Sequence, residues 1–370
     1  MVFRPMTECE VCKSGRGIVS RGIGVCATCL KERPAESLPV VMERHRRTRT
    51  SDGLVPEPPR DPKGLRCCFC ANECVIGEGQ VGYCGLRRNI SGRLEGGVKR
   101  GNFSWYFDAL PTNCVADWVC PAGTGSGYPA FAHRDGPEHG YRNLAVFSQV
   151  CSFDCAFCQN EDFRRLTRYP TWHTAEELAD AVAGLTSCIC YFGGDPSPQM
   201  PVFLNASLLA RKRAGGRILR ICWETNGSFH PSFLDAAMEL SLASGGCVKF
   251  DLKAFAPAIH RALTGTDNRR AMENFARAAA RIHERPDPPP LMASTLLVPG
   301  YIDAEEVGKI AVFVSGLDRD IPYALLAFAP HLYMTDLPAT SRSQADECLS
   351  AARDAGLTRV RLGDVYLLGP

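Results

Sequence analysis

The sequence predicts an α/β fold that begins near residue 141 and follows two cysteine-rich, metal-binding segments. From residue 144 onward, short apolar runs typical of buried strands alternate with longer stretches of helical periodicity. Repeated strand–helix units imply a parallel sheet with right-handed crossovers. Before residue 121, by contrast, cysteines recur at the short spacings of metal-ligand groups. Chemistry in such a fold belongs at the carboxyl ends of the strands, so we expect the functional residues there.

Length and composition narrow the class of protein. The 370 residues can supply one large domain and one or two small ones, and the net charge of +2 favours neither a nucleic-acid partner nor an anionic membrane. No apolar run approaches the roughly 20 residues that span a bilayer, and Met1 to Pro5 lack a signal-peptide core. The 19 cysteines cluster as metal ligands, which argues against disulfides. We therefore expect a cytoplasmic protein in a reducing or anaerobic cell.

The first cysteine group predicts a metal module over residues 1–50. Its pattern is Cys9-x2-Cys12-x13-Cys26-x2-Cys29, and two such pairs can surround one ion tetrahedrally. A zinc ribbon is the first interpretation and a rubredoxin-like single iron the second, because both ions accept four thiolates. Four cysteines close the coordination shell, which favours a structural role. The basic run 42–49 is interpreted as a solvated helix end or linker, and residues 51–63, with four prolines, as a linker.

A second group lies within a cysteine-rich segment at residues 64–140. It reads Cys67-x2-Cys70-x3-Cys74-x9-Cys84, and two further cysteines follow at Cys114 and Cys120. An auxiliary iron–sulfur cluster can draw four ligands from these six cysteines and the neighbouring Cys68. One structural zinc with buried free thiols is an equally good interpretation, because spacing alone does not choose the metal.

The third group, Cys151-x3-Cys155-x2-Cys158, is the one around which the chain is organised. Three thiols leave one corner of a cubane iron–sulfur cluster without a protein ligand, since a complete set has four. An open coordination position lets a substrate or cofactor bind the iron directly. The alternative is a ferredoxin-like cluster whose fourth cysteine comes from elsewhere in the chain.

The strands and helices of the last 230 residues are assigned from apolar runs and helical periodicity. Helix 173–183 has Thr174 as its N-cap and an acidic first turn. The expected strands are 144–148, 188–192, 217–223, 247–252, 291–298, 323–328 and 358–362. The other expected helices are 201–214, 231–243, 268–284, 304–315 and 342–355. The polar motifs that follow strands are Gly193-Gly194-Asp195-Pro196, Glu224-Thr225-Asn226-Gly227, Asp251-Leu252-Lys253, Val298-Pro299-Gly300 and the run 328–336.

As an ordered set over residues 64–370, these motifs resemble radical S-adenosylmethionine (SAM) enzymes. The Cys158-Gln159-Asn160 ending is similar to the branch related to pyruvate formate-lyase activating enzyme. The resemblance implies a partial (β/α)6 radical-SAM barrel over residues 141–370 and a [4Fe-4S] cluster on Cys151, Cys155 and Cys158. SAM would chelate its open iron and be cleaved reductively to a 5′-deoxyadenosyl radical.

Hydrogen abstraction from a protein or peptide, as by a glycyl-radical activase, is the activity that this resemblance implies. The electron donor would be a ferredoxin or a flavodoxin. One alternative is a radical SAM enzyme that acts on a small molecule or lipid. A non-catalytic electron-transfer or interaction protein is the alternative from another class, and the strand-end motifs argue against it.

The resemblance also implies which residues contact SAM. Phe157 would lie beside the adenine, and the turn at Gly193 and Gly194 would bind the amino group. Lys253 would face the SAM carboxylate as a point charge. The whole implied cofactor-binding set is Phe157, Gly193, Gly194, Asp195, Glu224, Asn226, Asp251, Lys253 and His331. Some members have a structural alternative. Phe157 could serve packing alone, and Gly193 and Gly194 could form an ordinary turn. Asp251 and Lys253 could form a surface ion pair, and His331 could be a structural histidine.

Residues 64–140 are finally expected to form a metal-stapled lid over the barrel mouth. Its aromatic residues Trp105, Tyr106, Phe107 and Trp118 would line the substrate site. Packing of these side chains against the barrel is the alternative.

Overall fold

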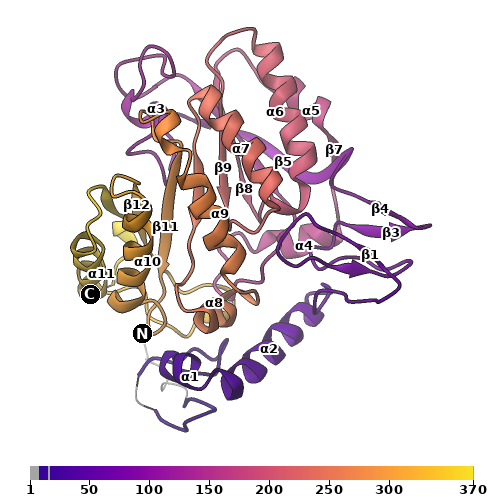
Figure 1. The fold of residues 1–370 in the computed structure, drawn as a ribbon, viewed down its shortest axis with the longest axis vertical. Coiled ribbons are helices and arrows are strands. Elements are labelled where there is room, and N and C mark those ends of the chain that lie inside the picture. The colour runs from indigo at the N-terminus through magenta and orange to yellow at the C-terminus, as the bar shows by residue number, and fades with distance from the viewer. Residues whose placement is uncertain (1–7, 16, 370) are drawn as a thin grey trace.

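The structure, a computed structural model, describes residues 8–15 and 17–369. Residues 1–5, on which the signal-peptide expectation rests, lie outside this range. A nine-stranded sheet in the order β13-β12-β11-β10-β9-β8-β6-β5-β7 forms the centre (Figure 1). Its strands are β5 (Arg100–Ala109), β6 (Arg142–Ser148), β7 (Trp172–Thr174), β8 (Thr186–Gly193), β9 (Arg220–Thr225), β10 (Val248–Asp251), β11 (Leu291–Leu297), β12 (Tyr323–Ala327) and β13 (Val360–Gly363).

The strands from β6 to β13 are parallel wherever two of them pair, which confirms the predicted α/β fold with a partial barrel. Helices α6, α7, α9 and α10 lie on one side of this curved sheet (Figure 1). The helices of this region are α4 (Asp162–Arg168), α5 (Ala175–Asp180), α6 (Met200–Ala214), α7 (Pro231–Ser244), α8 (Pro257–Thr264), α9 (Arg269–Ala279), α10 (Ala304–Leu317) and α11 (Arg342–Asp354).

Local sequence signals explain where several of these elements begin and end. The predicted cap of α5 is present as a capping box, in which Thr174 Oγ1 accepts from the backbone N–H of Glu177 at 3.2 Å. Helix α6 ends at Ala214, and its C-cap is Gly215, whose φ of +59° suits glycine. A turn follows, so β9 begins at Arg220 and not at residue 217 as predicted. Helix α9 stops at Ala279, five residues before the predicted end, and a short 3₁₀ turn follows.

The N-terminal segment contains α1 (Ala27–Glu32) and α2 (Pro34–Ser51), and both helices pack on α8 (Figure 1). Apolar side chains from this segment, including Val25 and Leu30, belong to the same buried cluster as the barrel core. The basic run 42–49 lies in α2, and the prediction that it is solvated is wrong for His45 and Arg49, which are buried. Both residues have acceptors inside the protein, as shown below. The division into domains at residues 50, 63 and 140 stays a prediction.

Residues 64–140 form small hairpins and then extend the main sheet. The short elements are β1 (Leu65–Arg66), β2 (Val75–Ile76), β3 (Arg88–Ile90), β4 (Arg93–Glu95) and α3 (Pro121–Thr124). Strand β5 carries Trp105, Tyr106 and Phe107 and pairs antiparallel with β6, so these aromatics lie on a sheet strand. The stretch 110–122 packs against the interior of the barrel, where Ala116 and Val119 contact Met292 and other buried side chains. In the described part of the chain, every helix is too short or too polar to cross a membrane.

A buried ion pair attaches the 110–140 stretch to the barrel. Arg220 of β9 donates from two guanidinium nitrogens to the carboxylate of Glu138 at 2.8 and 2.5 Å, and both side chains are at most 1% exposed. Arg220 also donates to the carbonyl of Phe131 at 2.8 Å. Burial alone would raise the pKa of Glu138, but the guanidinium of Arg220 lowers it below the usual carboxyl range.

We predict that Glu138→Gln lowers the free energy of unfolding by about 3–5 kcal/mol, because it leaves the Arg220 charge buried without a counter-ion. The loss should be largest at neutral pH. Since the folded-state pKa of Glu138 is lowered, its stabilisation is lost as the pH falls through that pKa. Urea unfolding at several pH values measures both effects.

The control is Asp235→Asn, which breaks the exposed ion pair with Arg277 and should change stability much less. Equal effects of the two substitutions would contradict the structural role given to Glu138.

Candidate active site at the carboxyl ends of the strands

The three-thiol loop follows β6 and faces an open cavity of about 980 Å³. Cys151 is buried, Cys155 and Cys158 are half-buried, and all three line this cavity. The loop is also fixed through its backbone: the N–H of Asp154 donates to Thr264 O at 2.8 Å, and that of Ala156 donates to Leu263 O at 2.9 Å. Helix α8 therefore positions the loop that carries the thiols.

Asp154, between the first two thiols, is the most constrained side chain of the loop. Its carboxylate is 1% exposed and lies 2.7 Å from His45 Nδ1, 2.7 Å from Arg164 Nη2 and 3.4 Å from Arg49 Nη1. The other ring nitrogen of His45 lies 3.0 Å from Ala262 O, so both nitrogens face oxygen acceptors. Burial alone would raise the pKa of Asp154, but His45 and the two arginines lower it to about 2. Helices α2 and α4 thus hold the loop through one carboxylate.

Asp195 and Asn226, at the ends of β8 and β9, form hydrogen bonds with other residues of the chain. Asp195 accepts from Asn226 N at 2.9 Å, Thr225 Oγ1 at 3.0 Å and Ser197 N at 2.8 Å. Asn226 Nδ2 donates to the hydroxyl of Ser152, in the cluster loop, at 2.9 Å. These two predicted cofactor-binding residues line the cavity, and their polar groups tie the strand ends to the thiol loop.

Gly193 and Gly194 allow β8 to approach the thiol loop closely. A Cβ on Gly194 would lie 2.3 Å from Val150 O, and one on Gly193 would lie 2.8 Å from the Phe147 ring. Gly193 also has a φ of +100°, which side chains disfavour. The thiol of Cys151 donates to Gly194 O at 3.4 Å. Glycine is therefore required here by packing against the chain itself.

Lys253 and Asp251 place opposite charges on the cavity wall, at the end of β10. Their side chains form an ion pair, and Lys253 Nζ lies 5.4 Å from the centre of the Phe157 ring. Burial alone would lower the pKa of Lys253, but Asp251 and Cys155 raise it above its usual value. Asp251 Oδ1 is buried and has no hydrogen-bond partner among the described residues. A buried acceptor without a partner is costly, which favours a polar ligand at this position.

The remaining predicted residues lie at the borders of the cavity or outside it. Glu224 lines the cavity and pairs with Lys249 at 2.7 Å. His331 is not among the lining residues, and its Nε2 lies 3.7 Å from a carboxylate oxygen of Glu161. Tyr333 donates to Asp52 Oδ2 at 2.8 Å. The structure therefore brings together every predicted cofactor-binding residue except His331.

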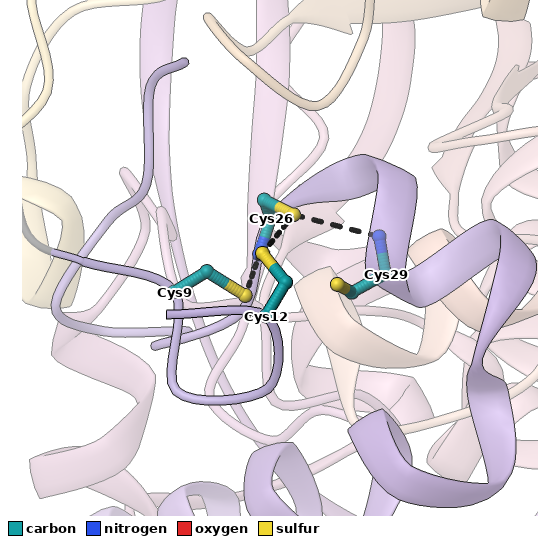
Figure 2. A group of neighbouring side chains, drawn as sticks. All are labelled: Cys9, Cys12, Cys26 and Cys29. Atoms are coloured by element: carbon teal, nitrogen blue, oxygen red, sulfur yellow. Dashed lines mark hydrogen bonds between the residues drawn. The ribbon is translucent and has the colours of Figure 1, made fainter. Parts of the chain in front are cut away.

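The four N-terminal cysteines form a compact metal-ligand group. The sulfur atoms of Cys9, Cys12, Cys26 and Cys29 all lie within 4.8 Å of one another, and Figure 2 shows their side chains turned toward one another. Zn–S bonds of about 2.3 Å in a tetrahedron require sulfur atoms about 3.8 Å apart, so the arrangement fits one ion. Burial would raise the pKa of Cys9, but backbone N–H groups that donate to its sulfur lower it to about 6.

The cysteines predicted as ligands within residues 64–140 lie in two places. Cys67, Cys70, Cys74 and Cys84 are buried and line one small cavity of about 280 Å³. Cys114 and Cys120 lie apart from them, inside the barrel, on the wall of a different cavity. The structure brings the first four together and leaves the other two apart from them, and the metal at the first four stays a prediction.

Two sets of residues around these cavities were not identified from the sequence. The first is the group that surrounds Asp154: the basic run of α2 was the available signal, but its hydrophilic composition indicated a solvated surface. The second is a row of cysteines on the inner face of the sheet. The sequence pattern Cys188-Ile189-Cys190 could have indicated this row, because residues two apart in a strand lie on the same face of the sheet.

Parts of the chain are similar in sequence to known proteins. The radical SAM superfamily model matches residues 145–314. The pyruvate formate-lyase-activating enzyme of Staphylococcus aureus (strain USA300) is 25% identical over 209 residues, which cover 52% of this chain and 76% of that enzyme.

Parts of the chain also resemble solved structures. A domain of pyruvate-formate lyase-activating enzyme from Bacteroides vulgatus ATCC 8482 has a TM-score of 0.38 and 19% identity, and covers 47% of this chain and 97% of that one. A radical SAM methyltransferase from Sphaerobacter thermophilus has a TM-score of 0.46 and 18% identity, and covers 60% of this chain and 67% of that one.

For the N-terminal group, we predict that Cys9→Ser combined with Cys26→Ser removes one metal ion per chain, because two thiolates cannot close a tetrahedral shell. Elemental analysis of zinc and iron measures the loss and identifies the ion. The control is Cys348→Ser, which changes a buried thiol in α11, away from the cysteine groups. An unchanged metal content in the double variant would show that the group is not a metal site.

Proposed function

We propose that this chain, in which residues 145–314 form a radical SAM domain, cleaves SAM reductively and takes a hydrogen atom from a protein or peptide. The chain is homologous to pyruvate formate-lyase-activating enzyme, and this relationship supports an activase-like reaction. The single observation that carries the proposal is the three-thiol loop, which faces a cavity bordered by the charged pair Asp251 and Lys253.

The residues of the cavity fit a [4Fe-4S] cluster together with SAM. Thiolates are the ligands that such clusters use, and three of them leave one iron for another ligand. The methionine part of SAM carries a carboxylate and an amino group. Lys253 offers the opposite charge to the first, and the unpartnered oxygen of Asp251 offers an acceptor to the second. When bound, the cluster would supply the one electron that cleaves the S–C5′ bond of SAM into methionine and a 5′-deoxyadenosyl group, which would take a hydrogen atom from the substrate.

The chain's own residues have three tasks in this reaction. Asp154, held by His45 and Arg164, keeps the thiol loop in one position, so that a ligand on the open iron is oriented. Phe157, Phe163 and Leu296 supply apolar surface that excludes water from the cavity. Lys253 balances the negative charge of the thiolates and of the ligand carboxylate. An external donor such as a ferredoxin or a flavodoxin would deliver the electron.

A protein or peptide substrate can be distinguished from a small molecule by deuterium transfer. Reduced, iron-loaded protein is incubated with SAM and an extract of deuterium-labelled cells, divided into a macromolecular and a low-molecular-weight fraction. We expect deuterium in 5′-deoxyadenosine only with the macromolecular fraction, because the abstracted atom comes from the substrate. Transfer from the small-molecule fraction alone would contradict the proposed substrate class.

The control variant carries alanine at Cys151, Cys155 and Cys158. It should lose about four iron atoms per chain and form no 5′-deoxyadenosine. If it retained SAM cleavage, the proposed function itself would be wrong, whichever fraction supplies the deuterium.

A further inference from the structure

A second cavity of about 810 Å³ lies inside the barrel, below the one that faces the three-thiol loop. Phe192, Glu224 and Lys249 line both cavities, so the two spaces have part of their walls in common. The second cavity is unusual in the number of thiols on its wall. These are Cys114, Cys120, Cys188, Cys190, Cys222 and Cys247.

Three of these thiols form a row across neighbouring strands. Cys190 of β8 pairs in register with Cys222 of β9. Val248 of β10 pairs with Trp223, and the N–H of Trp223 donates to Cys247 O at 3.0 Å, so Cys247 lies beside Cys222. Because side chains at one level of adjacent strands share a face, the three sulfur atoms enter the cavity side by side.

The 110–122 stretch supplies thiols from the opposite wall. Cys114 Sγ lies 3.0 Å from Lys249 Nζ, and Cys190 Sγ lies 3.2 Å from the same nitrogen. Cys114 therefore faces the row on the strands. Its position is fixed locally, because the N–H of Asp117 donates to Cys114 O at 2.8 Å.

One buried ammonium group, that of Lys249, contacts the thiols of Cys114 and Cys190. A carboxylate oxygen of Glu224 lies 3.6 Å from the first sulfur atom and 3.8 Å from the second. Lys249 is 3% exposed, and its ammonium group lies between two sulfur atoms and the carboxylate of Glu224. Thiolates at a metal bring net negative charge into the interior, and buried cations offset it. Free thiols that only fill a core pack against apolar neighbours and require no ammonium group.

From these contacts, we propose that Cys114, Cys190, Cys222 and Cys247 bind a second iron–sulfur cluster inside the barrel. Four thiols from one loop and three strands are the ligand set that such clusters use. All 19 cysteines are free, so no disulfide competes for them. A single zinc ion requires closer sulfur atoms. Within the described part of the chain, three or more metal-ligating atoms come within 4.8 Å of one another only at the N-terminal cysteines.

The site would place a cluster in a cavity that shares Phe192, Glu224 and Lys249 with the cavity of the three-thiol loop. A substrate that enters from the cavity at the strand ends would meet Glu224 and Lys249 first and the cluster next. The proposal is independent of the proposed function, because iron in this cavity can be measured whether or not SAM is cleaved.

The test compares wild-type protein with Cys190→Ala/Cys222→Ala after anaerobic loading with iron and sulfide. We expect the double variant to lose about two to four iron atoms and a similar amount of sulfide per chain. Mössbauer spectra should show the loss of one cluster while the cluster of the three-thiol loop remains. Cys348→Ala is the control and should keep the full content. Unchanged iron, or a loss of zinc alone, would refute the proposal.

Crystals of the loaded wild-type protein give a second test that requires no variant to fold. Anomalous scattering measured at the iron edge should give a peak between β8, β9 and β10, next to Lys249. A peak at the three-thiol loop with none inside the barrel would rule out the second cluster.

Discussion

The site depends on the contacts of one buried carboxylate, that of Asp154, with the side chains around it. A charge in the interior is costly unless cations and hydrogen bonds surround it, and Asp154 has three partners, from α2 and α4. Since it lies between two of the thiols, these partners fix the loop as well as the charge. The N-terminal helix α2 therefore has a direct part in positioning the site, although it is over 100 residues away in sequence.

The same loop joins the other parts of the chain. Asn72, within the second cysteine group, donates to Ser152 O at 2.6 Å, and Arg49 donates to Tyr83 O at 2.6 Å. From the other side, Asn226 donates to the hydroxyl of Ser152. Both cysteine-rich N-terminal segments and the barrel thus contact one another around a single loop.

The fold and the location of the site could be predicted, because both follow from local patterns. Apolar runs marked the parallel strands, and the motifs after them marked the strand ends. The sequence could not show that Asp195 and Asn226 form hydrogen bonds within the protein, because these bonds depend on how the ends of two strands meet. It also could not reveal the buried role of His45 and Arg49, because a basic helix is usually solvated. The row of interior thiols was missed for a related reason: its members come from three strands whose register only the structure shows.

The proposed function requires that the three-thiol loop hold a cluster whose open iron binds SAM. Electron paramagnetic resonance of the reduced, iron-loaded protein, recorded with and without SAM, tests this most directly. We expect SAM to change the g-values of one cluster component, because a new ligand on one iron alters its electronic structure. Identical spectra in the presence and absence of saturating SAM would contradict this expectation.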